Sequence, residues 1–300
     1  MADAFLEYDV VDVFADAPFA GNQLAVVHGA EALPDASLLA LAREFHFSET
    51  TFPTPIDGGR YRTRIFTPGG EIPFAGHPTL GTAWVLRDRG RLHDAAAVQE
   101  CGAGEIGVGF DGDLVELSAA PRDLAGPLGD AFVVQLAEAL GLELEDVDGE
   151  TWIAGTGLTF VHLPVRPDAV ARAEPPRAPV REIADLPETR DPLDGINLYV
   201  VDDRDDEGVD VHSRVFVPGL VPGASEDPAT GSAAAGLGMA LRARQVIADG
   251  GSYRIRQGIE IGRPSALRGR IEACGDDHGV TRVHVAGAVH PIARGQIRVP

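Results

Sequence analysis

A twenty-residue segment of this 300-residue chain occurs twice, and this duplication constrains the fold more than any other feature of the sequence. Residues 64–83 read RIFTPGGEIPFAGHPTLGTA, and residues 214–233 read RVFVPGLVPGASEDPATGSA. Aligned without gaps, the two segments share seven identities, where about one would be expected from background residue frequencies. We therefore expect two related halves, each containing one copy of the same supersecondary unit.

Each copy predicts a strand, a turn and a helix in that order. A strand with Arg and Phe is followed by Pro and Gly, and then by apolar and small residues that predict helices over 78–86 and 228–241. His77 and Asp227 hold the positions expected for the two helix N-caps. Because the N–H groups at a helix start are unpaired, two such starts brought together by pseudo-symmetry would bind a carboxylate.

The arginine that opens each copy has a structural interpretation. Arg64 and Arg214 recur by the internal symmetry, which a residue with a unique catalytic role would not be expected to do. We expect both to pair with carboxylates or with the carbonyl groups of turns.

The charge of the chain excludes several classes of partner. The formal net charge is −21, which argues against nucleic acid and anionic membranes. The chain has no lysine, so all 25 basic residues are arginines, and both a lysine Schiff base and the lysine of a phosphate-binding P-loop are excluded. No apolar run is long enough to span a membrane. These exclusions leave a small molecule as the expected ligand.

The polar residues show no pattern of metal ligands. Cys101 and Cys274 lack metal-ligand spacing, and with no secretory signal they indicate a reducing cytoplasm. The acidic run 202–210 predicts a solvated surface hairpin, because its carboxylates have no defined ligand register.

One glutamate lies in a predicted strand between aromatic residues. The sequence HFSETTF predicts a strand in which Phe47, Glu49 and Thr51 share one face. A carboxyl group beside an aromatic side chain is a candidate for moving a proton, since desolvation favours its neutral form. Taken alone, Glu49 also fits a solvated strand carboxylate.

Five motifs together resemble the PhzF family over nearly the whole chain. They are GNQLAVV (21–27), SETTF (48–52), RIFTPGGEIPFAGHPTLG (64–81), EDPATGSA (226–233) and QGIEIGRPS (257–265). The resemblance implies an α/β (α+β) diaminopimelate epimerase-like fold, in which each of two pseudo-symmetric lobes is a mixed β-sheet rolled around a central helix. We expect an N-terminal lobe at 1–120, joined by a C-terminal strand near 290–300, and a C-terminal lobe at 121–290.

The resemblance also implies an activity. Well-known members of this family isomerise trans-2,3-dihydro-3-hydroxyanthranilate in phenazine biosynthesis, moving a hydrogen without a metal or organic cofactor, and they form homodimers. Carried over by motif, Glu49 would be the general acid/base, with His77 and Asp227 beside it in the catalytic set. Gly76, Gly231 and Ser232 would bind a small, amino-acid-like carboxylic acid.

Other interpretations of the same residues stay open. The same residues would suit a cofactor-free epimerase or racemase with carboxylate bases, or a protein that binds a small molecule without turnover. A thiol-based racemase is disfavoured, because neither predicted helix start carries a cysteine. Taken singly, Asp227 fits a helix cap, His77 a capping or core histidine, and Ser232 a small packing residue.

A first prediction follows from the missing metal ligands and the missing lysine. We expect isomerase activity to survive exhaustive chelation and dialysis, because the sequence offers no constellation that holds a metal or a lysine-linked cofactor. The measurement compares turnover before and after treatment. Activity that is lost on chelation and restored by added zinc would contradict the prediction.

Overall fold

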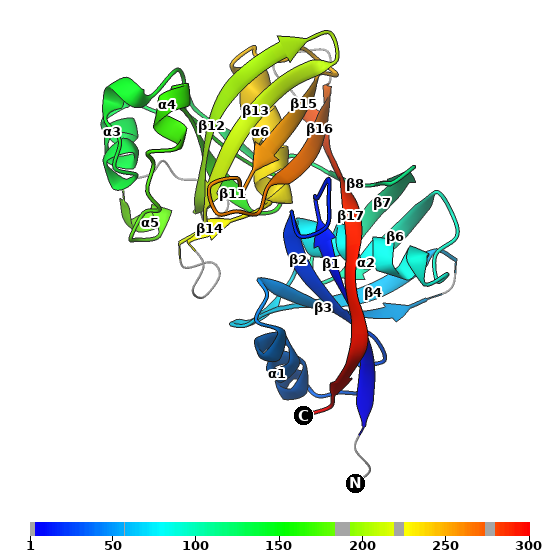
Figure 1. Cartoon of the computed structure of the whole chain (residues 1–300). Helices are drawn as coiled ribbons and strands as arrows, with labels where there is room; N and C mark the ends of the chain where they lie inside the picture. The colour runs from blue at the N-terminus through cyan, green and yellow to red at the C-terminus, as the bar shows by residue number, and fades with distance from the viewer. Residues whose placement is uncertain (1–3, 57, 184–192, 219–224, 274–279) are drawn as a thin grey trace. The chain divides into compact units, whose positions relative to one another are not determined.

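The computed structural model describes residues 4–56, 58–183, 193–218, 225–273 and 280–300 (Figure 1). The chain divides into two compact units. Unit 1 comprises residues 1–118 together with 286–300, and unit 2 comprises residues 119–285. Unit 1 is therefore built from two separate pieces of the chain.

Unit 1 contains a mixed sheet in the order β17, β1, β2, β3, β4, β6, β7, β8, with the short β5 also paired to β4. The β2–β3 and β4–β6 pairs are parallel, and the other pairs whose register is defined are antiparallel. The strands are β1 (Phe5–Val13), β2 (Asn22–Val27), β3 (Glu49–Pro55), β4 (Arg60–Thr67), β5 (Gly70–Ile72), β6 (Ala96–Cys101), β7 (Gly104–Asp111), β8 (Leu114–Ala119) and β17 (Val280–Arg298). Of β17, residues 286–298 belong to unit 1 and residues 280–285 to unit 2.

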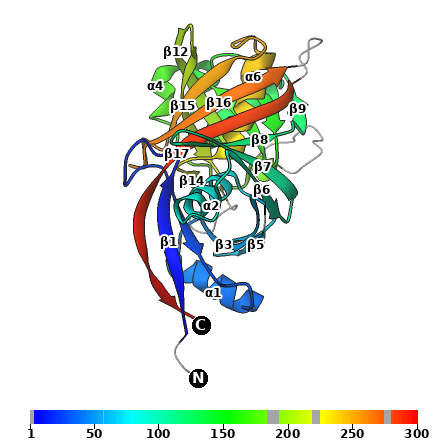
Figure 2. The same ribbon diagram turned by 90° about the vertical axis from the view of Figure 1, so that its right-hand side faces the viewer.

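The described residues of unit 1 include the helices α1 and α2. Helix α1 (Asp35–Phe45) packs Leu38 and Leu41 into an outer core with Phe52 and Phe66. Helix α2 (Gly76–Asp88) contacts β1, β2, β3, β6 and β7, so the strands surround it (Figures 1 and 2).

Unit 2 repeats this plan around α6 (Gly231–Ala243), which contacts β10, β11, β15 and β16. Helices α3 (Asp130–Ala139), α4 (Pro167–Val170) and α5 (Val180–Ile183) pack against β10 to β12 in a second apolar core, and η1 (Leu144–Asp146) follows α3. The strands are β9 (Asp123–Ala125), β10 (Trp152–Gly155), β11 (Thr159–Pro164), β12 (Leu193–Asp205), β13 (Gly208–Phe216), β14 (Glu226–Asp227), β15 (Ser252–Gln257) and β16 (Ser265–Ala273).

The strand pairings reproduce the internal repeat in three dimensions. In unit 1, β2 pairs parallel with β3, β3 antiparallel with β4, and β4 parallel with β6. In unit 2, β11 pairs parallel with β12, β12 antiparallel with β13, and β13 parallel with β15. The central helix follows β5 in unit 1 and β14 in unit 2. The prediction of one supersecondary unit used twice is confirmed.

The ungapped alignment is correct at the strands but wrong at the helices. Arg64 and Arg214 both lie in equivalent strands, β4 and β13, which are 150 positions apart. The helices begin at Gly76 and Gly231, which are 155 positions apart. The connection in the second copy is therefore five residues longer, and part of it, residues 219–224, lies outside the described residues. Structurally, Gly231 corresponds to Gly76 rather than to Gly81.

This shift also corrects the predicted N-caps. The cap positions are occupied by Ala75 and Thr230, both with extended backbone. His77 is the second residue of α2, and Asp227 lies in β14, three residues before the cap of α6. The pattern of a polar residue before proline led to this error, because Pro78 is accommodated within the first turn of α2 and Pro228 precedes α6 altogether.

Two strand predictions need correction and one surface prediction is confirmed. The strand predicted from HFSETTF begins only at Glu49, because His46 is left-handed with φ 55° and ends α1. The C-terminal strand expected near 290–300 is the end of the longer strand β17, which begins at Val280. The acidic run forms the exposed end of the β12–β13 hairpin, and Cys274 lies outside the described residues.

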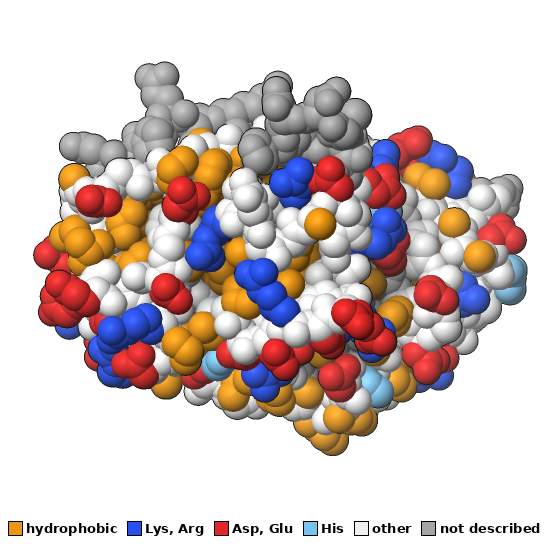
Figure 3. Space-filling view, turned by 90° about the horizontal axis from the view of Figure 1, so that it is seen from above, with side chains coloured by type: hydrophobic (Ala, Val, Ile, Leu, Met, Phe, Trp, Pro, Cys, Tyr) orange, Lys and Arg blue, Asp and Glu red, His pale blue; other side chains and the backbone are white. Residues whose placement is uncertain are grey.

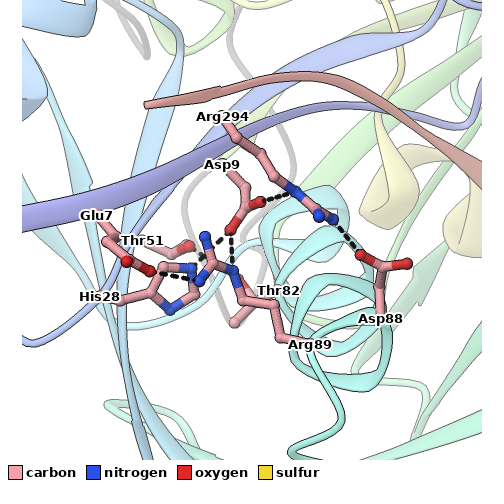
Figure 4. Close-up of polar contacts among 8 residues, drawn as sticks. All are labelled: Glu7, Asp9, His28, Thr51, Thr82, Asp88, Arg89 and Arg294. Atoms are coloured by element: carbon pink, nitrogen blue, oxygen red, sulfur yellow. Dashed lines mark hydrogen bonds and ion pairs between the residues drawn. The ribbon is translucent and has the colours of Figure 1, made fainter. Parts of the chain in front are cut away.

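A buried carboxylate joins the two pieces of unit 1 (Figure 4). Asp9 on β1 is 2% exposed and accepts hydrogen bonds from Nε of Arg89 at 2.6 Å and from Nε of Arg294 at 2.9 Å. His28 Nε2 lies 2.7 Å from the same carboxylate. Hydrogen bonds and charges from His28 and Arg89 outweigh the opposing effect of burial and lower the pKa of Asp9. The network links β1 with the end of α2 and with β17.

Arginine and acidic side chains are interspersed on the face shown in Figure 3, despite the net charge of the chain. Arg254, for example, bonds both Asp205 and Asp210 across the β12–β13 hairpin. Among the described residues, no helix has the length and apolar character needed to cross a membrane.

The two repeated arginines have the structural role expected for them. In unit 1, Arg64 makes a two-pronged contact with Glu71 at 2.8 and 2.6 Å, and its guanidinium lies 5.1 Å from the centre of the Phe66 ring. In unit 2, Arg214 does the same with Glu226 at 3.0 and 2.7 Å, and lies 4.9 Å from the centre of the Phe216 ring.

The two arginines differ in their exposure to solvent. The side chains of Arg214 and Glu226 are 7% and 4% exposed, and Arg214 also donates to the Val170 and Ala173 carbonyls. The side chain of Arg64 is 35% exposed.

The equivalent ion pairs therefore predict unequal effects on stability. Arg214→Ala leaves a buried carboxylate without its partner and is expected to lower the free energy of unfolding by about 3–5 kcal/mol. Arg64→Ala, the matched control, is expected to cost about 1 kcal/mol or less, because water screens the exposed pair. Urea denaturation followed by circular dichroism measures both losses. Equal losses in the two variants would contradict this assignment.

Candidate active site

The residue predicted to move a proton lies beside a predicted partner in unit 1. Glu49 begins β3 and His77 lies in the first turn of α2, and the sheet around α2 brings them together. Oε2 of Glu49 is 3.4 Å from Nε2 of His77, and the two side chains are 11% and 6% exposed. This distance is longer than a typical N–H···O hydrogen bond, so a small movement of either side chain makes or breaks the contact.

The imidazole of His77 is neutral at physiological pH. Burial lowers the pKa of His77 to about 3, and a contact with the backbone of Gln23 only partly opposes this shift. The contact with Glu49 is therefore one between a carboxyl group and a neutral ring rather than an ion pair. A neutral imidazole can hydrogen-bond to a buried carboxyl group without adding a second charge to the site.

Two residues that sequence analysis did not single out hold the other side of the His77 ring. Nδ2 of Asn22, the first residue of β2, is 3.3 Å from Nδ1 of His77. The Ser48 hydroxyl donates to Oδ1 of Asn22 at 3.4 Å. Both residues lie inside motifs that carry the family resemblance, but their contact with a residue 55 positions away is not visible in the sequence.

The start of α2 presents backbone N–H groups beside this pair. Its N-cap, Ala75, has no side chain that could accept from them, and Gly76 and His77 are the first two residues of the helix. The Thr79 hydroxyl donates to the Ala75 carbonyl at 2.9 Å, and Nε2 of Gln99 donates to the Thr79 hydroxyl at 2.8 Å. These bonds fix the first turn in position.

Unit 2 brings together the other predicted residues at the start of α6. The Thr230 hydroxyl donates to Oδ2 of Asp227 at 2.6 Å, and Nε2 of Gln257 donates to the Asp227 carbonyl at 2.8 Å. Gly231 and Ser232 are the first two residues of α6, and both are buried. Ser232 thus holds the place in unit 2 that His77 holds in unit 1. Thr230 and Gln257 lie within the quoted motifs, but nothing in the sequence alone marked them as part of the site.

No group of three or more His, Cys, Asp or Glu side chains able to hold a metal ion occurs in the described part of the chain. Cys101 lies on β6 as a half-buried free thiol. The polar groups around the two helix starts are carboxyl, imidazole, hydroxyl and amide groups. They suit acid–base chemistry and hydrogen bonding to a small polar molecule.

Comparison with known proteins agrees with this architecture. A family model described as phenazine biosynthesis-like protein (PhzC-PhzF) matches residues 11–295. The trans-2,3-dihydro-3-hydroxyanthranilate isomerase of Pseudomonas fluorescens is 35% identical over 296 residues, which cover 97% of this chain and 98% of that protein. The Pseudomonas aeruginosa protein of the same name is 33% identical over 295 residues, covering 96% and 98%. The chain belongs to the PhzF family, and it is an enzyme of the isomerase class.

Solved structures extend the likeness to a wider fold family. A PhzF-family protein of Bacillus anthracis superposes with a TM-score of 0.83 at 23% identity, covering 98% of this chain and 99% of that one. A hydroxyproline epimerase of Agrobacterium vitis superposes with a TM-score of 0.64 at 12% identity, covering 99% and 92%. The chain has the diaminopimelate epimerase-like fold, as the resemblance implied.

The buried histidine predicts a change in the pH dependence of stability. The folded-state pKa of His77 is depressed to about 3, so between about pH 3 and 6.5 the unfolded chain binds one more proton at this site. Stability is therefore lost as the pH falls through this window, by about 1.4 kcal/mol per pH unit.

The corresponding variant is His77→Gln, which cannot titrate. We expect the slope of unfolding free energy against pH to decrease by about 1.4 kcal/mol per unit between pH 6 and 4. His162, also buried with its pKa lowered to about 3, gives a second variant in unit 2 with the same expected change. Urea denaturation at several pH values measures the slopes. A slope identical to that of the wild type in both variants would show that these rings are not kept neutral by the fold.

Proposed function

We propose that this protein is a cofactor-independent isomerase that moves a hydrogen within a small carboxylic acid by general acid–base catalysis. Its substrate is a cyclic, amino-acid-like acid such as trans-2,3-dihydro-3-hydroxyanthranilate, the compound named for its Pseudomonas relatives. Glu49 is the group that takes up and returns the proton.

The observation that carries this proposal is the buried contact between Glu49 and His77 at 3.4 Å. Moving a hydrogen between two carbons of a conjugated acid requires one group that removes the proton from one carbon and delivers it to the other. Glu49 can do both without leaving its place on β3. Burial keeps the His77 ring neutral, so the ring does not compete with Glu49 for the proton.

Substrate binding requires groups of both signs. We propose that the backbone N–H groups at Gly76 and Gly231, together with Ser232, bind the carboxylate and hydroxyl groups, since helix starts favour anions. Asp227, a carboxylate just before the start of the second unit's central helix, binds the substrate's ammonium group.

Three further properties belong to the proposal. No metal or organic cofactor takes part, and the chain works as a homodimer in the cytoplasm. These rest on the family to which the chain belongs, on its lack of lysine and on its two cysteines, which suit a reducing compartment.

The decisive variant is Glu49→Gln, which keeps the shape and hydrogen-bonding reach of the side chain but removes the titrating group. We expect kcat to fall by about 10² to 10⁴ while substrate affinity changes little. Turnover and binding are measured separately, by product formation and by calorimetry. Turnover at a near wild-type rate would reject Glu49 as the proton carrier.

The comparison variant is Asp227→Asn, which should weaken substrate binding more than it lowers kcat, because the residue is assigned to an ammonium group. A loss confined to kcat would instead place Asp227 in the proton transfer.

Reaction in D₂O separates the remaining alternatives. We expect solvent-derived deuterium at the carbon that receives the proton, together with a shifted double bond. An inverted stereocentre with deuterium uptake and no shift of the double bond would identify an epimerase, and binding without either change would identify a non-catalytic protein.

A further inference from the structure

The chain contains the same three-residue hydrogen-bonded arrangement twice, once in each unit. In unit 1, Ser48 contacts Asn22, and Asn22 contacts Nδ1 of His77. In unit 2, the Ser213 hydroxyl donates to Oδ1 of Asn197, and Nδ2 of Asn197 lies 3.1 Å from Nδ1 of His162. The three residues occupy different positions in the two halves of the chain. The ungapped alignment of the repeated segment therefore does not match one set with the other.

The direction of the hydrogen bonds is fixed in unit 2. Nε2 of His162 lies 3.3 Å from the carbonyl oxygen of Ala154, which can only accept. Because the ring is neutral, its one proton is on Nε2, and Nδ1 must accept from the Asn197 amide. The Asn197 oxygen then accepts from Ser213. All three side chains are 1% exposed or less, so these hydrogen bonds are shielded from solvent and have a structural role.

In unit 1, the corresponding ring nitrogen faces a carboxyl group instead of a carbonyl. Nε2 of His77 lies 3.4 Å from Oε2 of Glu49. An ionised carboxylate, like a carbonyl, only accepts hydrogen bonds. By analogy with unit 2, the order in unit 1 is the Ser48 hydroxyl donating to Asn22 and the Asn22 amide donating to Nδ1, which leaves the ring proton on Nε2. The Nε2–Oε2 contact is longer than a typical hydrogen bond, and the backbone of Gln23 also contacts the ring, so the tautomer of His77 needs the direct test described below. Asn22 and His77 are 3% and 5% exposed, so water does not compete strongly for these groups.

We propose that Asn22 is a positioning residue that sets the tautomer of His77, so that an N–H group faces Glu49 and favours its proton-accepting form. Ser48 fixes the orientation of the Asn22 amide. The effect on catalysis rests on the proposed function. The tautomer of His77 does not, because it is a property of unit 1 that can be measured without substrate.

The direct test is nitrogen-15 NMR of the histidine rings, which distinguishes a protonated from an unprotonated ring nitrogen. In the wild type at neutral pH, we expect His77 and His162 both to be protonated at Nε2 and unprotonated at Nδ1. His77→Gln and His162→Gln identify the two sets of signals. A wild-type His77 with its proton on Nδ1 overturns the proposal. This measurement uses the wild-type protein, so it does not depend on the stability of any Asn22 variant.

The matched variants at position 22 are Asn22→Asp and Asn22→Leu, which are close to asparagine in size. The aspartate only accepts when ionised, so His77 Nδ1 becomes protonated. The leucine offers neither donor nor acceptor, so the preference of His77 for Nε2 is lost. His162 keeps its signals in both variants and serves as the internal control for folding. An unchanged His77 tautomer in a folded Asn22→Asp protein overturns the proposal.

Enzyme kinetics test the proposed effect of Asn22 on catalysis. In Asn22→Leu we expect kcat to fall by about tenfold to a hundredfold, as for other residues that orient a functional histidine. KM should change less, and the acidic limb of the kcat/KM profile should move to higher pH because Glu49 loses a donor. A fall in kcat with an unmoved pH profile indicates a merely structural role and overturns the proposal.

Failure of the proposed function has a different signature. If Glu49→Gln retained full turnover while His77 kept its proton on Nε2 and switched in Asn22→Asp, the role of Glu49 would be rejected and the tautomer assignment would stand. If neither Asn22 variant folds, Ser48→Ala replaces them, since it removes the donor that orients the amide. A His77 tautomer that is insensitive to Ser48→Ala then counts against the proposal.

Discussion

A helix enclosed by a sheet on several sides has no face left for water, and this constraint determines much of both units. Helices α2 and α6 are buried along most of their length, so their residues must be small where strands approach closely. A Cβ atom at Gly81 would lie 2.6 Å from Leu24, and one at Gly238 would lie 2.4 Å from the hydroxyl of Tyr253. At such distances the neighbouring side chain would have to move, and both Leu24 and Tyr253 are buried. Charged residues are accordingly confined to the last turns, where Arg87 and Arg242 suit the negative end of the helix dipole.

The same enclosure explains where polar chemistry can occur. A buried helix exposes unpaired N–H groups only at its start, and the polar residues of each unit gather there from the helix itself and from neighbouring strands. In unit 1 this place is shared by His77 from the helix and Glu49 from the neighbouring strand, with Asn22 and Ser48 behind the ring. In unit 2 it is shared by Ser232, Thr230 and Asp227. The interior that excludes water also keeps the imidazole neutral, so folding and the chemistry of the site depend on the same burial.

The sequence predicted the duplicated architecture and the role of the repeated arginines, because strand, turn and ion-pair patterns are local. It failed where a loop changed length. The five additional residues before α6 shifted the register, so proline and glycine identities aligned by coincidence and Asp227 was placed at the helix N-cap. Asn22, Ser48 and Gln257 were not identified because their partners are set by the pairing of distant strands, which one sequence does not reveal. Thr230 was not identified because the start of α6 was predicted too early, which gave its cap position to Asp227. His162 lacked any ligand spacing, and its buried chain with Asn197 and Ser213 became visible only in three dimensions.

The division of unit 1 into two pieces has a consequence for the way the protein is made. All residues of unit 2 have been synthesised once the chain reaches residue 285, whereas unit 1 still lacks the part of β17 that pairs with β1 from Val13 to Phe5. The N-terminal unit therefore completes its sheet last, contrary to the usual order in which domains fold as they leave the ribosome. Until then β1 has an open edge on that side, and Asp9 lacks Arg294, one of its arginine partners. A newly made chain must keep that edge from pairing with other strands until its last residues emerge.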